Sequence, residues 1–197
     1  EESGLIIPVG KWIIQNAFSM CTECRKYYPE FRVSINLSYV QILKSPLMME
    51  LKQMIEHSGI SCSGIIVELT ESGYLEGTPA VRSVWNDMKQ LRIQIALDDF
   101  GTGYSNLMNI SNLEPDIVKL DRGFTLKALS RSYEYQLMQY VIEMVHKLNQ
   151  YVCVEGVETK EDLEKIKALG PDLIQGYYYS KPCSRDEFLK KFFGYSE

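Results

Sequence analysis

Short apolar runs alternate with longer amphipathic stretches along the whole chain. The short runs are rich in β-branched residues and predict six β-strands, at residues 32–37, 64–69, 93–98, 116–120, 151–155 and 172–175. The longer stretches carry apolar residues at helical spacing and predict helices at residues 8–27, 46–57, 79–90, 133–149, 160–169 and 185–193. Strands that alternate with helices are typical of an α/β fold with a parallel sheet.

Two architectures have this alternation. Six strands in 197 residues give each strand about the length of chain that one βα unit usually takes. An open doubly wound sheet and a (β/α)8 barrel both fit. The sequence starts directly with a helix, so the barrel interpretation expects about two strands to be missing from its front. No linker or low-complexity tract divides residues 1–197, which we therefore expect to be a single domain.

Composition narrows the class of ligand. Lys and Arg number 21 against 26 Asp and Glu, a net charge of −5, which argues against charge-driven binding of a DNA or RNA polymer.

No apolar run is long enough for a membrane span. The cysteine count, five, is odd and predicts reduced thiols in a cytosol. Cys21 and Cys24 have the spacing of a redox or zinc pair, but a second pair is missing, and we interpret them as incidental.

A polar residue stands at or near the end of every predicted strand. These residues are Asn36, Glu68, the pair Asp98 and Asp99, Lys119, Glu155 and Gln175, with Glu71 and Glu158 three residues after the first and last glutamates. Each has a simpler explanation when taken alone, as a turn residue, a helix cap, a first-turn acid or a surface charge. Their recurrence on all six strands favours one ligand site, because the carboxyl ends of parallel strands meet at one edge.

The charges of this expected site call for counterions. At the strand ends themselves, the ammonium of Lys119 offsets one of four carboxylates and leaves a charge of −3; the four are Glu68, Asp98, Asp99 and Glu155. Two carboxylates about 5 Å apart repel by roughly 3 kcal/mol at an effective dielectric near 20. Oxygen ligands suit Mg²⁺ or Mn²⁺, and the adjacent Asp98 and Asp99 could each reach a different ion. Two such ions serve phosphate-ester hydrolysis. His57 and His146 lie late in predicted helices, which disfavours a histidine-based metal site.

Seven sequence motifs, spread over residues 1 to about 182, resemble those of a known family. In order they are ESGLIIPVG, INLSYVQ, VELTES, ALDDFGTGYSNL, DIVKLDRGF, VEGVET and LIQGYYYSKP. The chain resembles the EAL-domain cyclic-di-GMP phosphodiesterases of bacteria. The resemblance implies a modified (β/α)8, TIM-like barrel that hydrolyses cyclic di-GMP to linear pGpG with two Mg²⁺ or Mn²⁺ ions. The family's Glu-Ala-Leu motif, which supplies a further metal-binding glutamate, is absent from the sequence, so we expect an N-terminally incomplete EAL-type domain.

The resemblance also implies a role for each polar residue. It makes Asn36, Glu68, Asp98 and Asp99 the metal ligands, with Asp98 between the two ions. Glu155 and Lys119 become the catalytic pair that positions and activates the attacking water. Gln175 is expected to bind substrate, Glu71 to anchor the DDFGTG loop, and Glu158 to support the site.

Several expectations about context follow from the same resemblance. They are a homodimer, a sensor or diguanylate-cyclase domain upstream, and a cytoplasmic location, alone or as the cytoplasmic part of a membrane-attached protein. Two other functions stay open: a catalytically silent receptor that binds cyclic di-GMP, and a different metal-dependent barrel enzyme acting on phosphate or enolate substrates.

Overall fold

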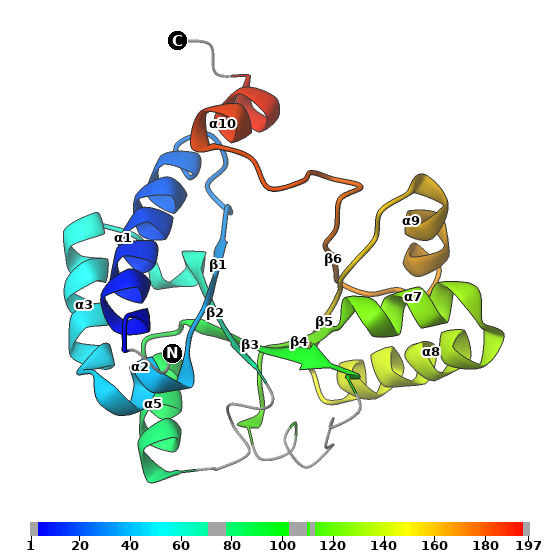
Figure 1. Cartoon of the computed structure of the whole chain (residues 1–197), viewed down its shortest axis with the longest axis horizontal. Coiled ribbons are helices and arrows are strands. Elements are labelled where there is room, and N and C mark those ends of the chain that lie inside the picture. Colours follow the sequence, from blue (N-terminus) through cyan, green and yellow to red (C-terminus); the bar gives the residue numbers. More distant parts are fainter. Residues whose placement is uncertain (1–3, 71–77, 103–109, 111–112, 195–197) are drawn as a thin grey trace. The chain divides into compact units, whose positions relative to one another are not determined.

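The chain forms a six-stranded sheet with helices between the strands (Figure 1). A computed structural model describes residues 4–70, 78–102, 110 and 113–194. The strands are β1 (Val33–Asn36), β2 (Ile65–Thr70), β3 (Gln94–Phe100), β4 (Ile117–Leu120), β5 (Tyr151–Val154) and β6 (Leu173–Ile174). They follow one another across the sheet in chain order, and β1–β2, β3–β4, β4–β5 and β5–β6 pair in parallel. The predicted α/β fold is confirmed.

All six predicted helices are present. The described helices are α1 (Ile6–Cys24), α2 (Tyr39–Lys44), α3 (Leu47–Ser58), the 3-10 turn η1 (Cys62–Gly64), α5 (Pro79–Gln90), α7 (Arg122–Ser130), α8 (Ser132–Lys147), α9 (Lys160–Lys167) and α10 (Arg185–Phe193). Two short helices, α2 and α7, were not predicted; each begins within three residues of the end of a strand. Among the described residues, no helix is both long and apolar enough to cross a membrane.

The chain folds as two compact units, each with its own helices. The first holds the described parts of Glu1–Leu69, Gly73–Ile95 and Cys183–Glu197, and the second those of Thr70–Ser72 and Ala96–Pro182. In the first unit α1 packs against α2, α3 and β1, and α5 packs against α2 and α3. In the second, α7 packs against α8 and α9, and α8 packs on β5.

The middle strands are buried more completely than the outer ones. All four residues of β4 are buried, as are five of the six in β2. Because successive side chains point to opposite faces of a sheet, both faces of these two strands are covered. In β1 only Ile35 is buried, and neither residue of β6 is fully buried. A strand partly open to solvent can carry polar side chains such as Asn36 without a desolvation penalty.

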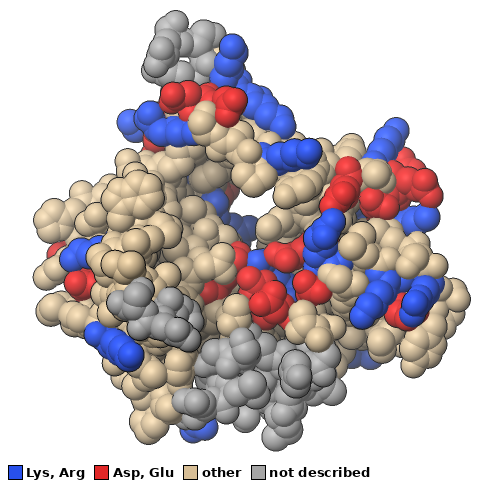
Figure 2. Space-filling model, in the orientation of Figure 1, with Lys and Arg blue, Asp and Glu red and all other residues tan. Residues whose placement is uncertain are grey.

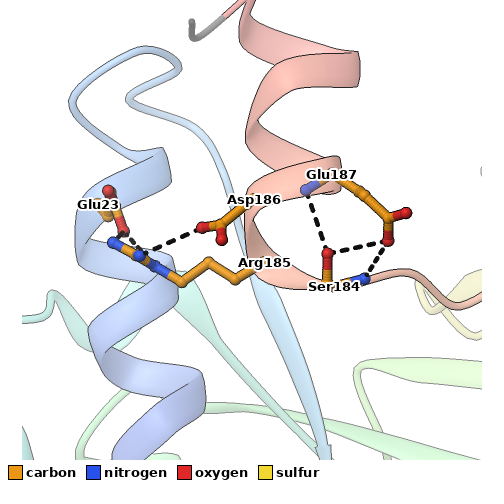
Figure 3. A network of polar contacts seen from close by, with 5 residues as sticks. All are labelled: Glu23, Ser184, Arg185, Asp186 and Glu187. Carbon is orange, nitrogen blue, oxygen red and sulfur yellow. Dashed lines mark hydrogen bonds and ion pairs between the residues drawn. The ribbon is translucent and has the colours of Figure 1, made fainter. Parts of the chain in front are cut away.

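The C-terminal helix α10 belongs to the first unit. Ser184 caps it and forms a reciprocal capping box with Glu187 (Figure 3). Arg185 then donates from Nε and Nη2 to Glu23 Oε2 on α1, at 3.0 and 2.6 Å (Figure 3). The Phe193 ring stacks on Tyr27 with centroids 5.2 Å apart. The ion pair thus joins α10 to α1, and aromatic packing joins it to the turn that follows α1.

Candidate functional site

A buried lysine joins two carboxylates in the second unit. Lys119 lies on β4, and its Nζ is 3.0 Å from Asp98 Oδ1 on β3 and 2.7 Å from Glu155 Oε1 just after β5. The three side chains are 6%, 12% and 18% exposed. Charges this far from water are kept only when paired, because each alone would carry a large desolvation cost. The structure thus brings together three of the residues predicted from the sequence, with a residual charge of −1.

A bulge in β3 arranges the two adjacent aspartates. The pairing of β3 with β4 shifts between Leu97 and Phe100, so that Asp98 and Asp99 together stand opposite Lys119. Asp99 has φ of 61°, a left-handed conformation that is uncommon outside glycine, and its N–H donates to Asp98 Oδ1 at 2.9 Å. Strain of this kind at a strand end is typical of functional sites. The bulge therefore sets both aspartates at one point of the sheet edge, in agreement with the predicted pair, whose two roles stay predictions.

Glycine is required where this strand leaves the sheet. Gly101 has φ of 102°, and a Cβ there would lie 2.9 Å from Cδ1 of Phe124 on α7. The close approach lets the chain turn beside Asp99. Residues 103–109 and 111–112 of the DDFGTG loop region lie outside the described residues, and so does Glu71.

Asn36 and Glu68 are neighbours in the first unit. They are register partners on the parallel strands β1 and β2, and Leu37 N–H donates to the Glu68 carbonyl at 3.0 Å. Register partners on neighbouring strands point to the same face of a sheet, so the amide and the carboxylate lie side by side. Glu68 is buried, with 6% of its surface exposed. Their proximity agrees with the predicted ligand pair, whose role stays a prediction.

The donor chemistry fits a hard divalent cation. Amide and carboxylate oxygens are the atoms that Mg²⁺ and Mn²⁺ prefer. Within the part of the chain that the structure describes, however, no three His, Cys, Asp or Glu side chains gather as a formed metal cage. In the second unit the Lys119 ammonium already pairs with both Asp98 and Glu155. Any metal at Asp98 would therefore have to share this carboxylate with Lys119.

The loop after β5 is held at both ends. Glu158 Oε1 accepts hydrogen bonds from Arg122 Nη2 at 2.7 Å and from Arg122 Nε at 3.3 Å. This contact raises the pKa of the Arg122 guanidinium. Gly156 has φ of 80°, and a Cβ there would meet the Arg122 side chain. Arg122 thus covers the loop that starts with Glu155. Sequence reasoning missed Arg122 as a functional residue, although it stands inside the DIVKLDRGF motif.

Gln175 is fixed through its backbone. Its N–H donates to the Val154 carbonyl at 2.8 Å, and its carbonyl accepts from Val157 N–H at 3.2 Å. Gly176 follows, where a Cβ would overlap the Val157 carbonyl oxygen. The end of β6 and the loop after Glu155 are therefore packed backbone to backbone, which places Gln175 beside that loop.

The cysteine pair has the properties of packed thiols. Cys21 and Cys24 are fully buried in α1. Burial raises the pKa of Cys24 to about 11, and it raises that of Cys21 as well. Thiols that stay protonated at neutral pH are poor nucleophiles and metal ligands, in agreement with the interpretation of this pair as incidental.

Comparison with known proteins decides the family. The model of the EAL domain matches residues 1–182. The chain belongs to the EAL-domain family. It is 33% identical over 182 residues to the cyclic di-GMP phosphodiesterase PdeR of Escherichia coli, covering 92% of this chain and 28% of PdeR. It is 31% identical to the cyclic di-GMP phosphodiesterase PdeF of the same organism, over 92% of this chain and 24% of PdeF. The chain thus spans about a quarter of the length of these curated relatives.

Solved EAL structures have the same fold. The EAL enzyme Bd1971, in its form with bound cAMP and cyclic di-GMP, matches with a TM-score of 0.89 and 29% identity, over 94% of this chain and 52% of that one. The PaMucR phosphodiesterase in complex with c-di-GMP matches with a TM-score of 0.88 and 26% identity, over 96% of this chain and 77% of that one. The predicted TIM-like α/β fold is confirmed by these matches.

Proposed function

We propose that this EAL domain hydrolyses cyclic di-GMP to linear pGpG in a reaction that needs Mg²⁺ or Mn²⁺. The observation that carries the proposal is the buried ion-pair chain of Asp98, Lys119 and Glu155 in a member of this family. Relatives of the chain are named cyclic di-GMP phosphodiesterases, and PaMucR is a phosphodiesterase in complex with that nucleotide.

Each residue of the candidate site has a proposed role in this hydrolysis. Water attacks one phosphorus and gives a proton to Glu155, while the bond from that phosphorus to the ribose 3′ oxygen breaks and this oxygen takes up a proton to become the 3′ hydroxyl. Lys119 keeps the Glu155 carboxylate oriented at 2.7 Å and offers its positive charge to the phosphate oxygens as they gain negative charge. Asn36, Glu68, Asp98 and Asp99 would hold the cations, which when bound polarise the phosphate and acidify the attacking water. Gln175 would contact the substrate, and Glu158 supports the loop that carries Glu155.

Product analysis tests the proposal. The protein is incubated with cyclic di-GMP in ¹⁸O-labelled water with Mn²⁺, with Mg²⁺ or with EDTA, and the nucleotides are separated and weighed by mass spectrometry. We expect pGpG that carries one ¹⁸O atom on its 5′ phosphate in the presence of either cation, and no product with EDTA. Binding of cyclic di-GMP without product would contradict hydrolysis and indicate the alternative function of a receptor.

A further inference from the structure

Gly10 lies in the second turn of α1, inside the helix, where glycine is less favourable than alanine. The structure gives a reason for it. A Cβ at Gly10 would overlap Nε2 of Gln41 on α2 and would stand 2.7 Å from its Cδ. Gly10 is buried, and Gln41 is only 3% exposed. The absence of a side chain at Gly10 therefore makes the space in which the Gln41 amide lies.

The buried amide of Gln41 fixes a turn. Its Oε1 accepts a hydrogen bond from Ser38 N–H at 3.0 Å, while Ser38 Oγ accepts one from Val40 N–H at 3.1 Å. Ser38 Oγ also accepts from the Gln41 backbone N–H, so Ser38 and Gln41 form a capping box at the start of α2. A buried polar side chain with a hydrogen bond holds its geometry firmly, because breaking the bond would leave polar atoms unsatisfied. The Gln41 side chain, which lies in the space beside Gly10 of α1, therefore holds Ser38 in position.

This turn comes directly after Asn36. Asn36 ends β1 and pairs with Glu68, and Leu37 N–H donates to the Glu68 carbonyl. The next N–H, that of Ser38, is the one that Gln41 accepts. Two successive backbone N–H groups after Asn36 are thus fixed, one by β2 and one by Gln41. Both bonds restrict the backbone that immediately follows Asn36.

We propose that Gln41, in the space left by Gly10, is a positioning residue that aims the Asn36 amide at the divalent cation. The inference rests on the proposed function, because it takes Asn36 to be a metal ligand. Gln41 touches neither metal nor substrate. Supporting residues that orient a metal ligand typically change metal affinity by about 10- to 100-fold when they are replaced.

A double-mutant cycle on Gly10 and Gln41 tests the inference, with Mn²⁺ affinity measured by electron paramagnetic resonance. We expect Gln41→Ala and Gly10→Ala each to weaken Mn²⁺ binding by about tenfold or more. The double variant should be no weaker than Gln41→Ala alone, since the shortened side chain at position 41 leaves room for the methyl group added at position 10. Gln53→Ala, at an exposed glutamine of α3, is the matched control and should leave the affinity unchanged.

A second variant and a second measurement separate positioning from loss of folding. Gln41→Met keeps a long side chain in the cavity but removes the acceptor, so it should weaken Mn²⁺ binding while circular dichroism shows a folded chain. Hydrogen exchange at the Ser38 amide should become faster in the Gln41 variants. Folded Gln41 variants that bind Mn²⁺ as the wild type does would overturn the inference and leave the proposed function standing. A wild type with neither Mn²⁺ binding nor turnover would overturn both.

Discussion

Asp98 Oδ1 lies 3.0 Å from Lys119 Nζ because a bulge sets Asp98 and Asp99 together opposite Lys119 on the next strand. Glu155 approaches the same ammonium from the other neighbouring strand, since β4 pairs with β5. The order of the parallel strands thus converts three positions far apart in the sequence into one buried cluster of charges.

Removal of the positive charge of Lys119 should destabilise the folded protein. Lys119→Met would leave Asp98 and Glu155 facing each other with little access to water, and we expect the free energy of unfolding to fall by about 3–5 kcal/mol. Urea denaturation followed by circular dichroism measures this change. Lys160→Met, at a side chain 78% exposed and 3.9 Å from Glu164, is the control and should cost less than about 1 kcal/mol. Lys160 lies on α9, where the surface carries both basic and acidic side chains (Figure 2). Equal losses in the two variants would contradict the account of a buried, mutually dependent cluster.

The glycine after Gln175 should not tolerate a side chain. Gly176→Ala would push a methyl group into the Val157 carbonyl, a backbone atom that cannot rotate away. We expect a loss of about 1–3 kcal/mol in unfolding free energy, the usual scale of overpacking. Gly170→Ala is the matched control, since Gly170 has φ of 74° with nothing within 4 Å of a Cβ, and only the left-handed backbone should cost about 1 kcal/mol. Thermal melts of both variants measure the difference, and an unaffected Gly176→Ala would be at odds with the packing described.

The Arg122 and Glu158 pair should matter little for stability. Their side chains are 58% and 38% exposed, so solvent screens the attraction. We expect Arg122→Ala to change the free energy of unfolding by less than about 1 kcal/mol while it lowers turnover, because the loop after Glu155 loses its cover. Arg122→Lys should recover only part of the turnover, since a single ammonium cannot give both contacts to Glu158. A variant that keeps full turnover would show that this pair does not support Glu155.

Three of the five thiols should differ clearly in their reactivity toward an alkylating reagent. Burial raises the pKa of Cys24 to about 11 and also raises that of Cys21, whereas Cys183 is exposed. We expect iodoacetamide at about pH 8 to modify Cys183 in the native protein, and Cys21 and Cys24 only after unfolding in urea. Because the pKa of Cys24 is higher in the folded state, its contribution to stability should be complete below about pH 9 and fall as the pH rises toward 11. Mass spectrometry of labelled peptides checks the order, and early labelling of Cys24 would refute it.

The sequence predicted the regular parts of this fold because periodicity carries them. The helix from Pro79 to Gln90 and the helix from Arg185 to Phe193 have the predicted bounds. The missed helices α2 and α7 carried local signals: the Ser38 and Gln41 capping box, and Asp121, which accepts from Gly123 N–H at 2.7 Å.

The candidate site was harder to derive from the sequence. The positions at the strand ends follow from alternation of strands and helices, and the structure brings Asp98, Lys119 and Glu155 together as expected. The left-handed Asp99 and the contact between Arg122 and Glu158 depend on tertiary packing, so no local pattern predicts them. The role of Gly10 likewise becomes visible only when α2 lies against α1.

The most direct test of the proposed function compares Asp98→Asn with Asp186→Asn, which alters a carboxylate 82% exposed on α10. Formation of pGpG from cyclic di-GMP is followed with Mn²⁺ present, together with a melting curve for each variant. The account predicts that Asp98→Asn lowers kcat/KM by at least about 100-fold, the scale of losing one electrostatic contact at a reacting centre, while Asp186→Asn stays at the wild-type value. A folded Asp98→Asn variant that turns over cyclic di-GMP at the wild-type rate would contradict it.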